Sequence, residues 1–245
     1  LAISYENLGS IHRSMGHMEE ALKYFDEVVL LFKELFESNP RNESLKEGLA
    51  ISHERLGSIH QSMGHMEEAL KYFEKFIELS KEFYESNPRN ESLKYSLAIS
   101  YSKLGDIHQS MGHMEEALKY FEKDIELSKE LYESNPRSES MKNGLAISYE
   151  RLGSIHQLMG HMEEALKYFE QYSSLGKELY ESNPRNIDLL EGLGISYNKL
   201  AMVYKQIGDN DSGRNNFRQW KNIVSHLTTN LPQVSKYQEW NKLEY

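Results

Sequence analysis

Hydrophobic residues recur every three or four positions through most of the chain. Between residues 42 and 64 apolar side chains and two histidines follow this spacing, and between residues 65 and 88 the same pattern resumes. Positions with this period lie on one side of an α-helix. The pattern predicts two consecutive helices of about 20 residues. Their stripes consist of Leu45, Leu49, His53, Leu56, His60 and Met63 in the first helix, and of Met66, Leu70, Phe73, Ile77 and Phe83 in the second.

Residues that end or begin helices separate these stripes. Gly64 tolerates the left-handed backbone with which many helices end, and Pro88 cannot continue the second helix. Asn90 is a suitable N-cap for the helix that follows, and so is Asp209, which replaces His65 in the last copy of the pattern. These signals predict a hairpin of two helices closed by a proline turn.

The same hairpin recurs along the chain. The undecapeptide MGHMEEALKYF begins at residues 15, 63, 111 and 159, so the period is 48 residues. Counted from Leu1, repeats begin at residues 1, 49, 97, 145 and 193, and the fifth is degenerate. One hairpin cannot bury its apolar stripes alone, whereas stacked hairpins bury them against each other. We therefore expect a single solenoid over residues 1–230 and a C-terminal capping helix over residues 231–245.

The order of residues within each repeat is distinctive. An aromatic residue precedes a Leu-Gly pair and a second ring, followed by an alanine and a phenylalanine four residues apart and then a proline. In the first repeat these are Tyr5, Leu8, Gly9, His12, Ala21, Phe25 and Pro40. This order resembles the tetratricopeptide repeat family over residues 1–227. The family unit has about 34 residues, so the 48-residue unit is similar to a long, bacterial type of this repeat. The resemblance implies an all-α, right-handed α-solenoid superhelix of antiparallel helix hairpins.

The two small residues in this order have a packing explanation. Gly9 and Ala21 stand where the two helices of a hairpin approach most closely, and Phe25 fills the space that remains. The fifth repeat has Ala201 and Gly213 at these two positions. We expect the same hairpin contact in every full repeat.

The two ends of the array differ from its middle. Residues 1–15 correspond to only the latter part of a first helix, so an apolar stacking face is expected to be open there. Residues 208–230 replace most of the second-helix pattern with polar side chains, as a terminal capping repeat does. Beyond them, Tyr237, Trp240 and Leu243 are placed to close the stack.

Charge and composition narrow the range of partners. The chain has 28 Lys and Arg against 38 Asp and Glu, and the acids occur in every repeat. Nucleic acids and anionic membranes are bound by clustered basic residues, so neither is expected as a partner. The absence of cysteine excludes disulfides, thiolate metal sites and cysteine nucleophiles. The longest apolar run, residues 28–32, is far shorter than the roughly 20 residues of a membrane helix.

The first residues, LAISYENLG, contain neither an initiator methionine nor a secretory signal. We expect this sequence to be a segment of a larger cytoplasmic protein of bacterial origin. From the family resemblance, nucleotide-binding or protease-like modules often accompany such arrays.

Histidine recurs in pairs, which raises the question of metal binding. Equivalent residues of stacked hairpins lie about 10 Å apart per helix contact, too far to share an ion bound at about 2 Å. The two histidines of one repeat are separated by a glycine that breaks the helix, unlike the i,i+4 pairs of zinc-binding helices. We predict a packing role and no metal for His12, His60, His108 and His156 and for His17, His65, His113 and His161.

The sequence gives no support to catalysis. Paired acids such as Glu19 and Glu20 stand at helix starts, where negative charge is favourable. No nucleophile elbow, phosphate-binding loop or dinucleotide-binding glycine motif is found. Because the local environments repeat, no unique pocket with unlike acidic groups is expected. We predict a chain that is not an enzyme and has no cofactor.

The family resemblance places a partner on the concave surface lined by the first helices. Positions 3, 6, 10 and 13 of each repeat share one helical face, set apart from the packing stripe. We expect this face to bind a peptide or protein segment of apolar and basic character. In the alternative, the isoleucines pack against neighbouring first helices and the acids are merely solvated. The residues concerned are Ile3, Glu6, Ser10, Arg13, Ile51, Glu54, Ser58, Gln61, Ile99, Ser102, Asp106, Gln109, Ile147, Glu150, Ser154, Gln157, Ile195, Asn198, Met202 and Lys205.

Two further interpretations follow from the same residues. The clamp that some family members use to bind a C-terminal carboxylate needs Lys, Arg and Asn at these positions, and Glu6, Ser10, Glu54 and Ser58 do not supply them. As an alternative to groove binding, the open N-terminal face stacks end to end on a second copy. In that case the array is a homo-oligomeric assembly module.

Overall fold

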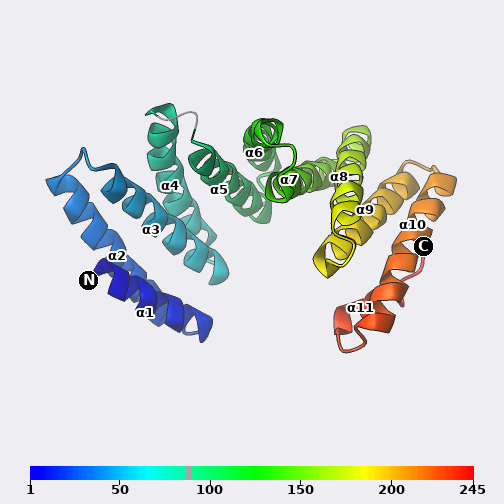
Figure 1. The fold of residues 1–245 in the computed structure, drawn as a ribbon, viewed down its shortest axis with the longest axis horizontal. Coiled ribbons are helices and arrows are strands. Elements are labelled where there is room, and N and C mark those ends of the chain that lie inside the picture. Colours follow the sequence, from blue (N-terminus) through cyan, green and yellow to red (C-terminus); the bar gives the residue numbers. More distant parts are fainter. Residues whose placement is uncertain (87–89) are drawn as a thin grey trace. The chain divides into compact units, whose positions relative to one another are not determined.

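The computed structural model describes residues 1–86 and 90–245, and every regular element in these ranges is a helix (Figure 1). The predicted all-α arrangement of consecutive helix pairs is confirmed. The full-length helices have 20 or 21 residues, in agreement with the hydrophobic period. In chain order the helices are α1 (Ala2–Ser14), α2 (Met18–Ser38), α3 (Glu43–Ser62), α4 (Met66–Ser86), α5 (Glu91–Ser110), α6 (Met114–Ser134), α7 (Glu139–Leu158), α8 (Met162–Ser182), α9 (Ile187–Gln206), α10 (Asn210–Asn230) and α11 (Ser235–Trp240).

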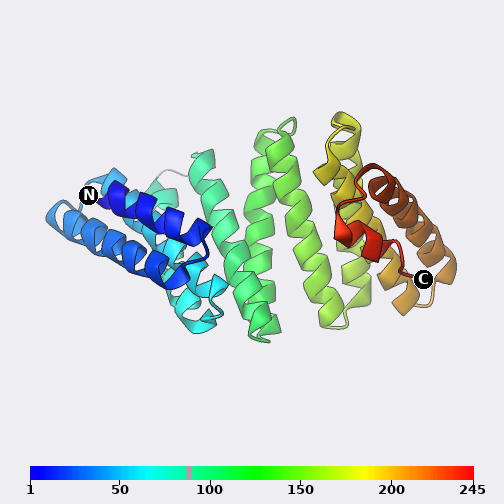
Figure 2. The ribbon, with the colours of Figure 1, turned by 90° about the horizontal axis from the view of Figure 1, so that it is seen from below.

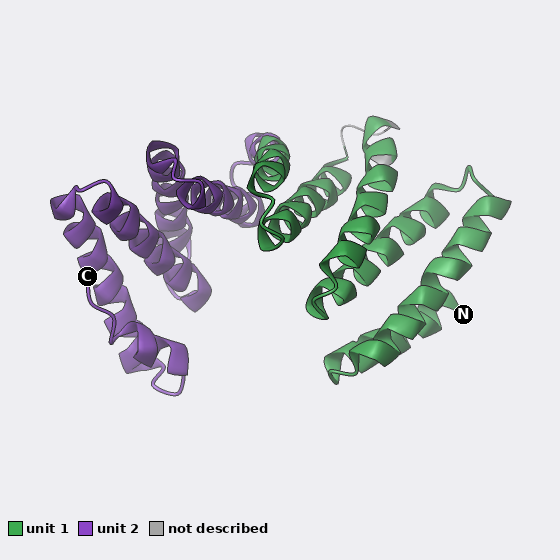
Figure 3. Cartoon of the chain, turned by 180° about the vertical axis from the view of Figure 1, so that it is seen from behind, with its two compact units in different colours: residues 1–127 green, residues 128–245 purple. Residues whose placement is uncertain are grey.

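The chain forms two compact units, Leu1–Leu127 and Ser128–Tyr245, and the division falls within α6 (Figure 3). Unit 1 has a core in which Phe73, Leu104 and Ile107 are buried together. In unit 2 a cluster of Leu190 and Leu227 closes around Tyr237, which follows the last repeat. The helix α11 lies beside α10 (Figures 1 and 2).

Helix boundaries follow the predicted caps. Gly16, Gly64, Gly112, Gly160 and Gly208, which end the first helices, have φ between 80° and 85°, in the left-handed region. The Asn90 side chain accepts a hydrogen bond from the backbone N–H of Leu93 at 3.2 Å, and Asp209 accepts one from Ser212 at 3.1 Å. Helix α4 ends at Ser86. The predicted turn at Asn87 and Pro88 and the side chain of Phe83 lie outside the described residues.

The packing explanation for the small residues holds in the full repeats. Phe25, Phe73, Phe121 and Phe169 are at most 1% exposed, and the equivalent alanines are fully buried. A Cβ atom added to Gly105 would lie 2.4 Å from Cε1 of Phe121, and one added to Gly153 would lie 2.6 Å from Cδ1 of Phe169. Only glycine leaves room for the ring, since contacts below 3.0 Å force a displacement.

His53 on α3 occupies a position where the other repeats have tyrosine, and it makes the second repeat sensitive to acid. Burial, with smaller effects of Lys75 and Lys33, lowers the pKa of His53 from 6.5 to about 4. The unfolded chain therefore takes up this proton near pH 6.5, whereas the folded chain does so only near pH 4. Stability contributed by neutral His53 is complete above about pH 6.5 and is lost as the pH falls towards 4. The equivalent residues are Tyr5, Tyr101, Tyr149 and Tyr197.

We expect His53→Tyr to reduce the loss of stability between about pH 7 and about pH 5. The measurement is urea denaturation of both chains at the two pH values. Burial also lowers the pKa of His60 and His108, so a part of the acid sensitivity should remain. An identical pH dependence in the two chains would contradict the prediction.

Candidate partner-binding surface

The residues predicted to bind a partner lie on the first helix of each repeat, at positions 3, 6, 10 and 13. We call this surface the first-helix face. In unit 1 it belongs to α1, α3 and α5, and in unit 2 to α7 and α9 (Figure 1). Within each unit, ion pairs join one first helix to the next, so their faces lie side by side.

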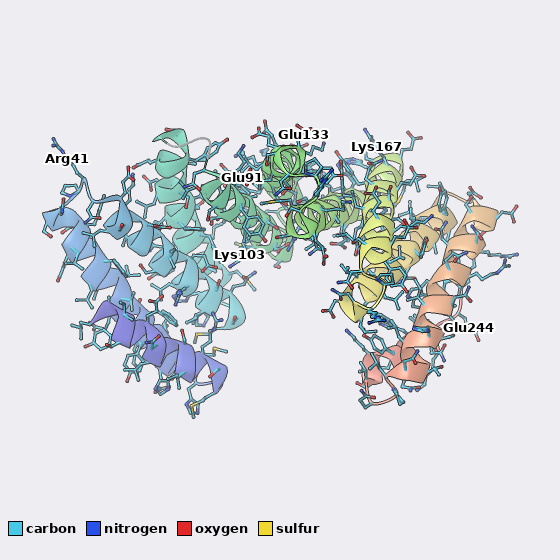
Figure 4. The ribbon with its side chains drawn as sticks, viewed as in Figure 1. Arg41, Glu91, Lys103, Glu133, Lys167 and Glu244 are labelled. Carbon is cyan, nitrogen blue, oxygen red and sulfur yellow. The ribbon has the colours of Figure 1, made fainter. Side chains whose placement is uncertain are left out.

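In unit 1 the carboxylate at position 6 of one repeat meets a cation at position 7 of the next. The Glu6 carboxylate lies 2.5 Å from the Arg55 guanidinium. The Lys103 ammonium contacts the Glu54 carboxylate and donates to Ser58 Oγ at 3.1 Å, while Ser58 donates to Glu54 at 3.1 Å. Figure 4 labels Lys103 on α5. Three groups on two helices thus form one closed polar network.

The same network recurs in unit 2. The Lys199 ammonium lies 2.9 Å from the Glu150 carboxylate and donates to Ser154 Oγ at 2.8 Å. Ser154 in turn donates to Glu150 at 2.9 Å. One helical turn further on, Gln157 donates to Gln206 at 2.7 Å. Glu150, Ser154 and Gln157, which were predicted as binding residues, therefore also tie α7 to α9.

The basic residues at position 7 were not predicted from the sequence. Their signal was present, since Glu54 and Lys103 are 49 residues apart, one more than the repeat. Each cation also lies over a buried ring of the preceding hairpin: Lys103 lies 5.3 Å from the ring centre of Phe73, and Lys199 lies 5.5 Å from that of Phe169. Because both partners of each ion pair are partly exposed, each pair contributes about 0–1 kcal/mol. A larger effect of these ion pairs concerns the character of the face. The carboxylates at position 6 are not free, because a cation of the next repeat already contacts each of them.

Isoleucines at position 3 remain accessible beside these networks. Ile51 and Ile99 are 39% exposed and Ile147 is 41% exposed, whereas Ile195 is half-buried. Ile3 at 70% and Met202 at 54% are more exposed still. Part of each isoleucine is covered by its surroundings, and part is available to a ligand.

The polar positions of the face differ in accessibility. Ser102 is 6% exposed and its hydroxyl is buried, so this position presents little surface to a partner, and its contact with one stays a prediction. The remaining members are exposed or half-buried. They are Glu6, Ser10 and Arg13 on α1, Glu54, Ser58 and Gln61 on α3, Asp106 and Gln109 on α5, Glu150, Ser154 and Gln157 on α7, and Asn198 and Lys205 on α9.

Clefts between second helices were not predicted. In unit 1 a cleft of about 390 Å³ is lined by α4, α5 and α6, with Tyr101 at its base and Glu78 and Lys81 at its edge. The ammonium of Lys81 lies 5.7 Å from the centre of the Tyr101 ring, so a basic group of the chain already covers that aromatic surface. In unit 2 a cleft of about 310 Å³ is lined by Tyr197 and Ile223.

The first histidine of each pair is stacked on a tyrosine of the second helix, and the second histidine is tilted against the first. The rings of His60 and Tyr72 lie 5.3 Å apart at an angle of 11°, and His65 lies 5.8 Å from His60. The pKa of His60 is lowered, chiefly by burial, so its ring is neutral near pH 7. Over residues 1–86 and 90–245, no three metal-ligating side chains come together. The arrangement serves as ring packing between the two helices of a hairpin.

Within the same two ranges, none of the helices is apolar over a stretch sufficient to span a bilayer.

Comparison with known proteins supports the repeat assignment. A sequence profile of the tetratricopeptide repeat matches residues 1–82, 48–130 and 96–178 in three overlapping copies. A search of curated proteins found no match.

Solved structures similar to this chain are helical repeat proteins. BtubC (BKLC) from P. vanneervenii is similar with a TM-score of 0.71 at 18% identity, over 90% of this chain and 78% of BtubC. A putative kinesin light chain of Podosopora anserina with nearly identical TPR-like repeats gives 0.65 at 19% identity, over 92% and 95%. MamA gives 0.58 at 17% identity, over 93% and 94%. At these identities the likeness concerns the fold.

Proposed function

Since the chain belongs to the tetratricopeptide repeat family, we propose that it is a non-enzymatic scaffold that binds a protein or peptide segment on its first-helix face. Repeats of this family are protein-interaction modules. We propose a cytoplasmic location in a bacterium and a partner of apolar and basic character.

The observation that carries the proposal is the row of accessible isoleucines at position 3, which we call the isoleucine line. It lies beside the polar networks that join neighbouring first helices. Ile51 and Ile99 present apolar surface that a ligand side chain can cover, and each buried aliphatic side chain contributes about 1.5–3 kcal/mol. Glu54 already accepts from one cation, but a carboxylate has about four acceptor sites. A basic group of the ligand can therefore share the carboxylate with Lys103.

The apolar part of the proposal is tested by polar substitution. Capture of partners from a cell lysate, followed by affinity measurement with the purified partner, provides the assay. The double variant Ile51→Ser and Ile99→Ser should weaken binding about tenfold or more, since tenfold corresponds to 1.4 kcal/mol. Leu30→Ser is the matched control, because Leu30 is 53% exposed on α2, outside the first-helix face. Equal affinities of the double variant and the control would exclude the isoleucine line as the binding surface.

The acidic part has its own test. Glu54→Lys with Glu150→Lys should weaken binding of a basic partner, because each change removes an acceptor and adds a like charge. The control is Glu27→Lys with Glu122→Lys, which makes the same change in net charge at exposed positions of α2 and α6. If the affinity for a genuine partner is unchanged in the first pair, the carboxylates do not contact it.

A specific observation favours a second function, self-association. Leu8 and Ile11 on α1 are 39% and 53% exposed, whereas their equivalents Leu56 and Ile59 are fully buried by the preceding hairpin. A second copy that stacks on α1 would cover them in the same way. Sedimentation over a range of concentrations should then show dimers that Leu8→Ser with Ile11→Ser abolishes. A chain that stays monomeric at the highest concentration contradicts this function.

A further inference from the structure

The fifth repeat differs from the others at its two small positions. The glycine of the full repeats is Ala201 here, and the alanine is Gly213. In the full repeats the alanine methyl is completely buried against the first helix. At Gly213 that methyl is missing, and the space it leaves is filled by another part of the chain.

The occupant is Tyr245. A Cβ atom added to Gly213 would lie 1.9 Å from the Tyr245 hydroxyl oxygen, so alanine and this tyrosine exclude each other. The Tyr245 ring lies 5.4 Å from the ring of Phe217, and the Lys205 ammonium lies 4.8 Å from its centre. Phe217 is half-buried, unlike its fully buried equivalents in the full repeats. It forms one wall of a pocket for an aromatic side chain.

Specific contacts direct the segment 241–245, which we call the tail, into this position. The Lys221 ammonium on α10 donates to the backbone carbonyls of Asn241 at 2.6 Å and Leu243 at 3.2 Å. Before the tail, α11 is fixed by Tyr237, whose hydroxyl donates to Glu191 at 2.6 Å. Figure 4 labels Glu244 in the tail, beside α10. The tail is thus held by its backbone, and its last side chain enters the pocket.

The pocket belongs to the first-helix face of the last repeat. A cavity of about 140 Å³ lies between the tail and the side chains of Asn198, Met202, Lys205, Phe217 and Trp220. The first three are the binding residues expected at positions 6, 10 and 13. The tail therefore lies on the surface that the proposed function gives to a partner.

We propose that this pocket is a binding site for an aromatic side chain of the partner segment. In the structure, Tyr245 of the same chain occupies the pocket in place of the partner. The inference rests on the proposed function, because the tail then competes with the partner. The preferred ligand has an aliphatic residue two positions before its ring, as Leu243 precedes Tyr245. The Tyr245 hydroxyl has no hydrogen-bond partner in the described part of the chain, so phenylalanine should fit equally well. A tethered ligand acts at millimolar effective concentration, so it lowers the apparent affinity of a partner.

The test measures binding of a labelled peptide Asn-Lys-Leu-Glu-Tyr, blocked at both ends, to the full chain and its variants. The variant Tyr245→Ala empties the pocket and should bind the peptide at least tenfold more tightly than the unchanged chain. Adding Gly213→Ala should remove this binding, since the methyl fills the pocket as it does in the other repeats. A peptide with Phe in place of Tyr should bind similarly, and one with Ala should not.

Two results of the peptide measurement would overturn the inference. One is the absence of peptide binding by a Tyr245→Ala chain whose circular dichroism and melting curve match those of the unchanged chain. The other is equal binding by the two chains. As an independent readout, Gly213→Ala alone should accelerate hydrogen exchange of residues 241–245, and unchanged exchange would contradict occupancy of the pocket.

These outcomes are distinct from those of the proposed function. The peptide is a segment of this chain and requires no knowledge of the partner. If it binds while the isoleucine variants leave partner affinity unchanged, the pocket stands and the proposed function fails. If the isoleucine variants weaken partner binding but the peptide does not bind, the reverse conclusion holds.

Discussion

Replacing Phe169 with alanine should lower the free energy of unfolding of unit 2 by about 3–5 kcal/mol. The ring is fully buried between α7 and α8, where Gly153 and Ala165 leave only enough room for it. Removing it loses the burial of a large apolar side chain and leaves a cavity that two rigid helices close only in part. Lys199, which lies over the ring, would also lose part of its contact. Chemical denaturation, with hydrogen exchange of α7 and α8 as a local probe, measures the effect.

Phe217→Ala is the matched control for this prediction. Phe217 has the same position in the fifth repeat but is only half-buried, and it lies against Ala201 rather than glycine. Its loss should therefore cost clearly less than the loss of Phe169. Equal losses at the two positions would show that burial between the helices is not what makes the ring important.

Gly153→Ala should destabilise unit 2 by about 1–3 kcal/mol, although alanine is the better helix former. The new Cβ would lie 2.6 Å from both Cδ1 and Cε1 of Phe169, so the ring must move out of a closely packed site. In a helix interior, alanine is favoured over glycine by about 1 kcal/mol, and the overlap has to exceed this gain. Urea denaturation of the variant and the unchanged chain provides the measurement.

Gly192 on α9, in the same unit, should tolerate alanine. The nearest atom to a Cβ added there is the Tyr172 hydroxyl at 3.8 Å, an ordinary contact. Gly192→Ala should therefore leave stability unchanged or raise it by up to about 1 kcal/mol. If Gly153→Ala behaved in the same way, the close approach of the two helices would not be a requirement of the fold.

The helices and their order were predictable because each signal is local and is repeated. Gly64 and Asn90 each specify a helix boundary through their own backbone or side chain, and the structure has the boundaries there. The pairing of Gly153 with Phe169 was also predictable, since a small and a large residue recur at fixed positions. Repetition turned weak local preferences into a strong prediction.

The first-helix face was predictable only in part. Helical geometry gives the residues that share a face, but it does not say which of them neighbouring helices cover. Ser102 is buried for this reason, and Glu54 and Glu150 are bound by cations from the next repeat. The interval of one repeat plus one residue was visible in the sequence. Which side chains this interval brings together depends on the spacing of neighbouring helices, and the sequence does not give that spacing.

The path of the tail was the least predictable feature. The expectation of a C-terminal capping helix over residues 231–245 remains a prediction, and within that range the structure has α11 at Ser235–Trp240. Two features of α10 direct the chain after α11. The Lys221 ammonium binds backbone carbonyls of the tail, and the space beside Gly213 receives Tyr245. The exchange of alanine for glycine was the only local sign that this hairpin receives a side chain from elsewhere.

The ion pairs between first helices have an evolutionary consequence. A full repeat can carry a base for the repeat before it and an acid for the repeat after it, as the second does with Arg55 and Glu54. If recombination between near-identical copies removed that whole repeat, Glu6 would meet Lys103, and the new junction would again join an acid to a base. An array can therefore lose a repeat that carries both charges without creating a mismatched junction, provided that the repeat before it has the acid and the repeat after it has the base.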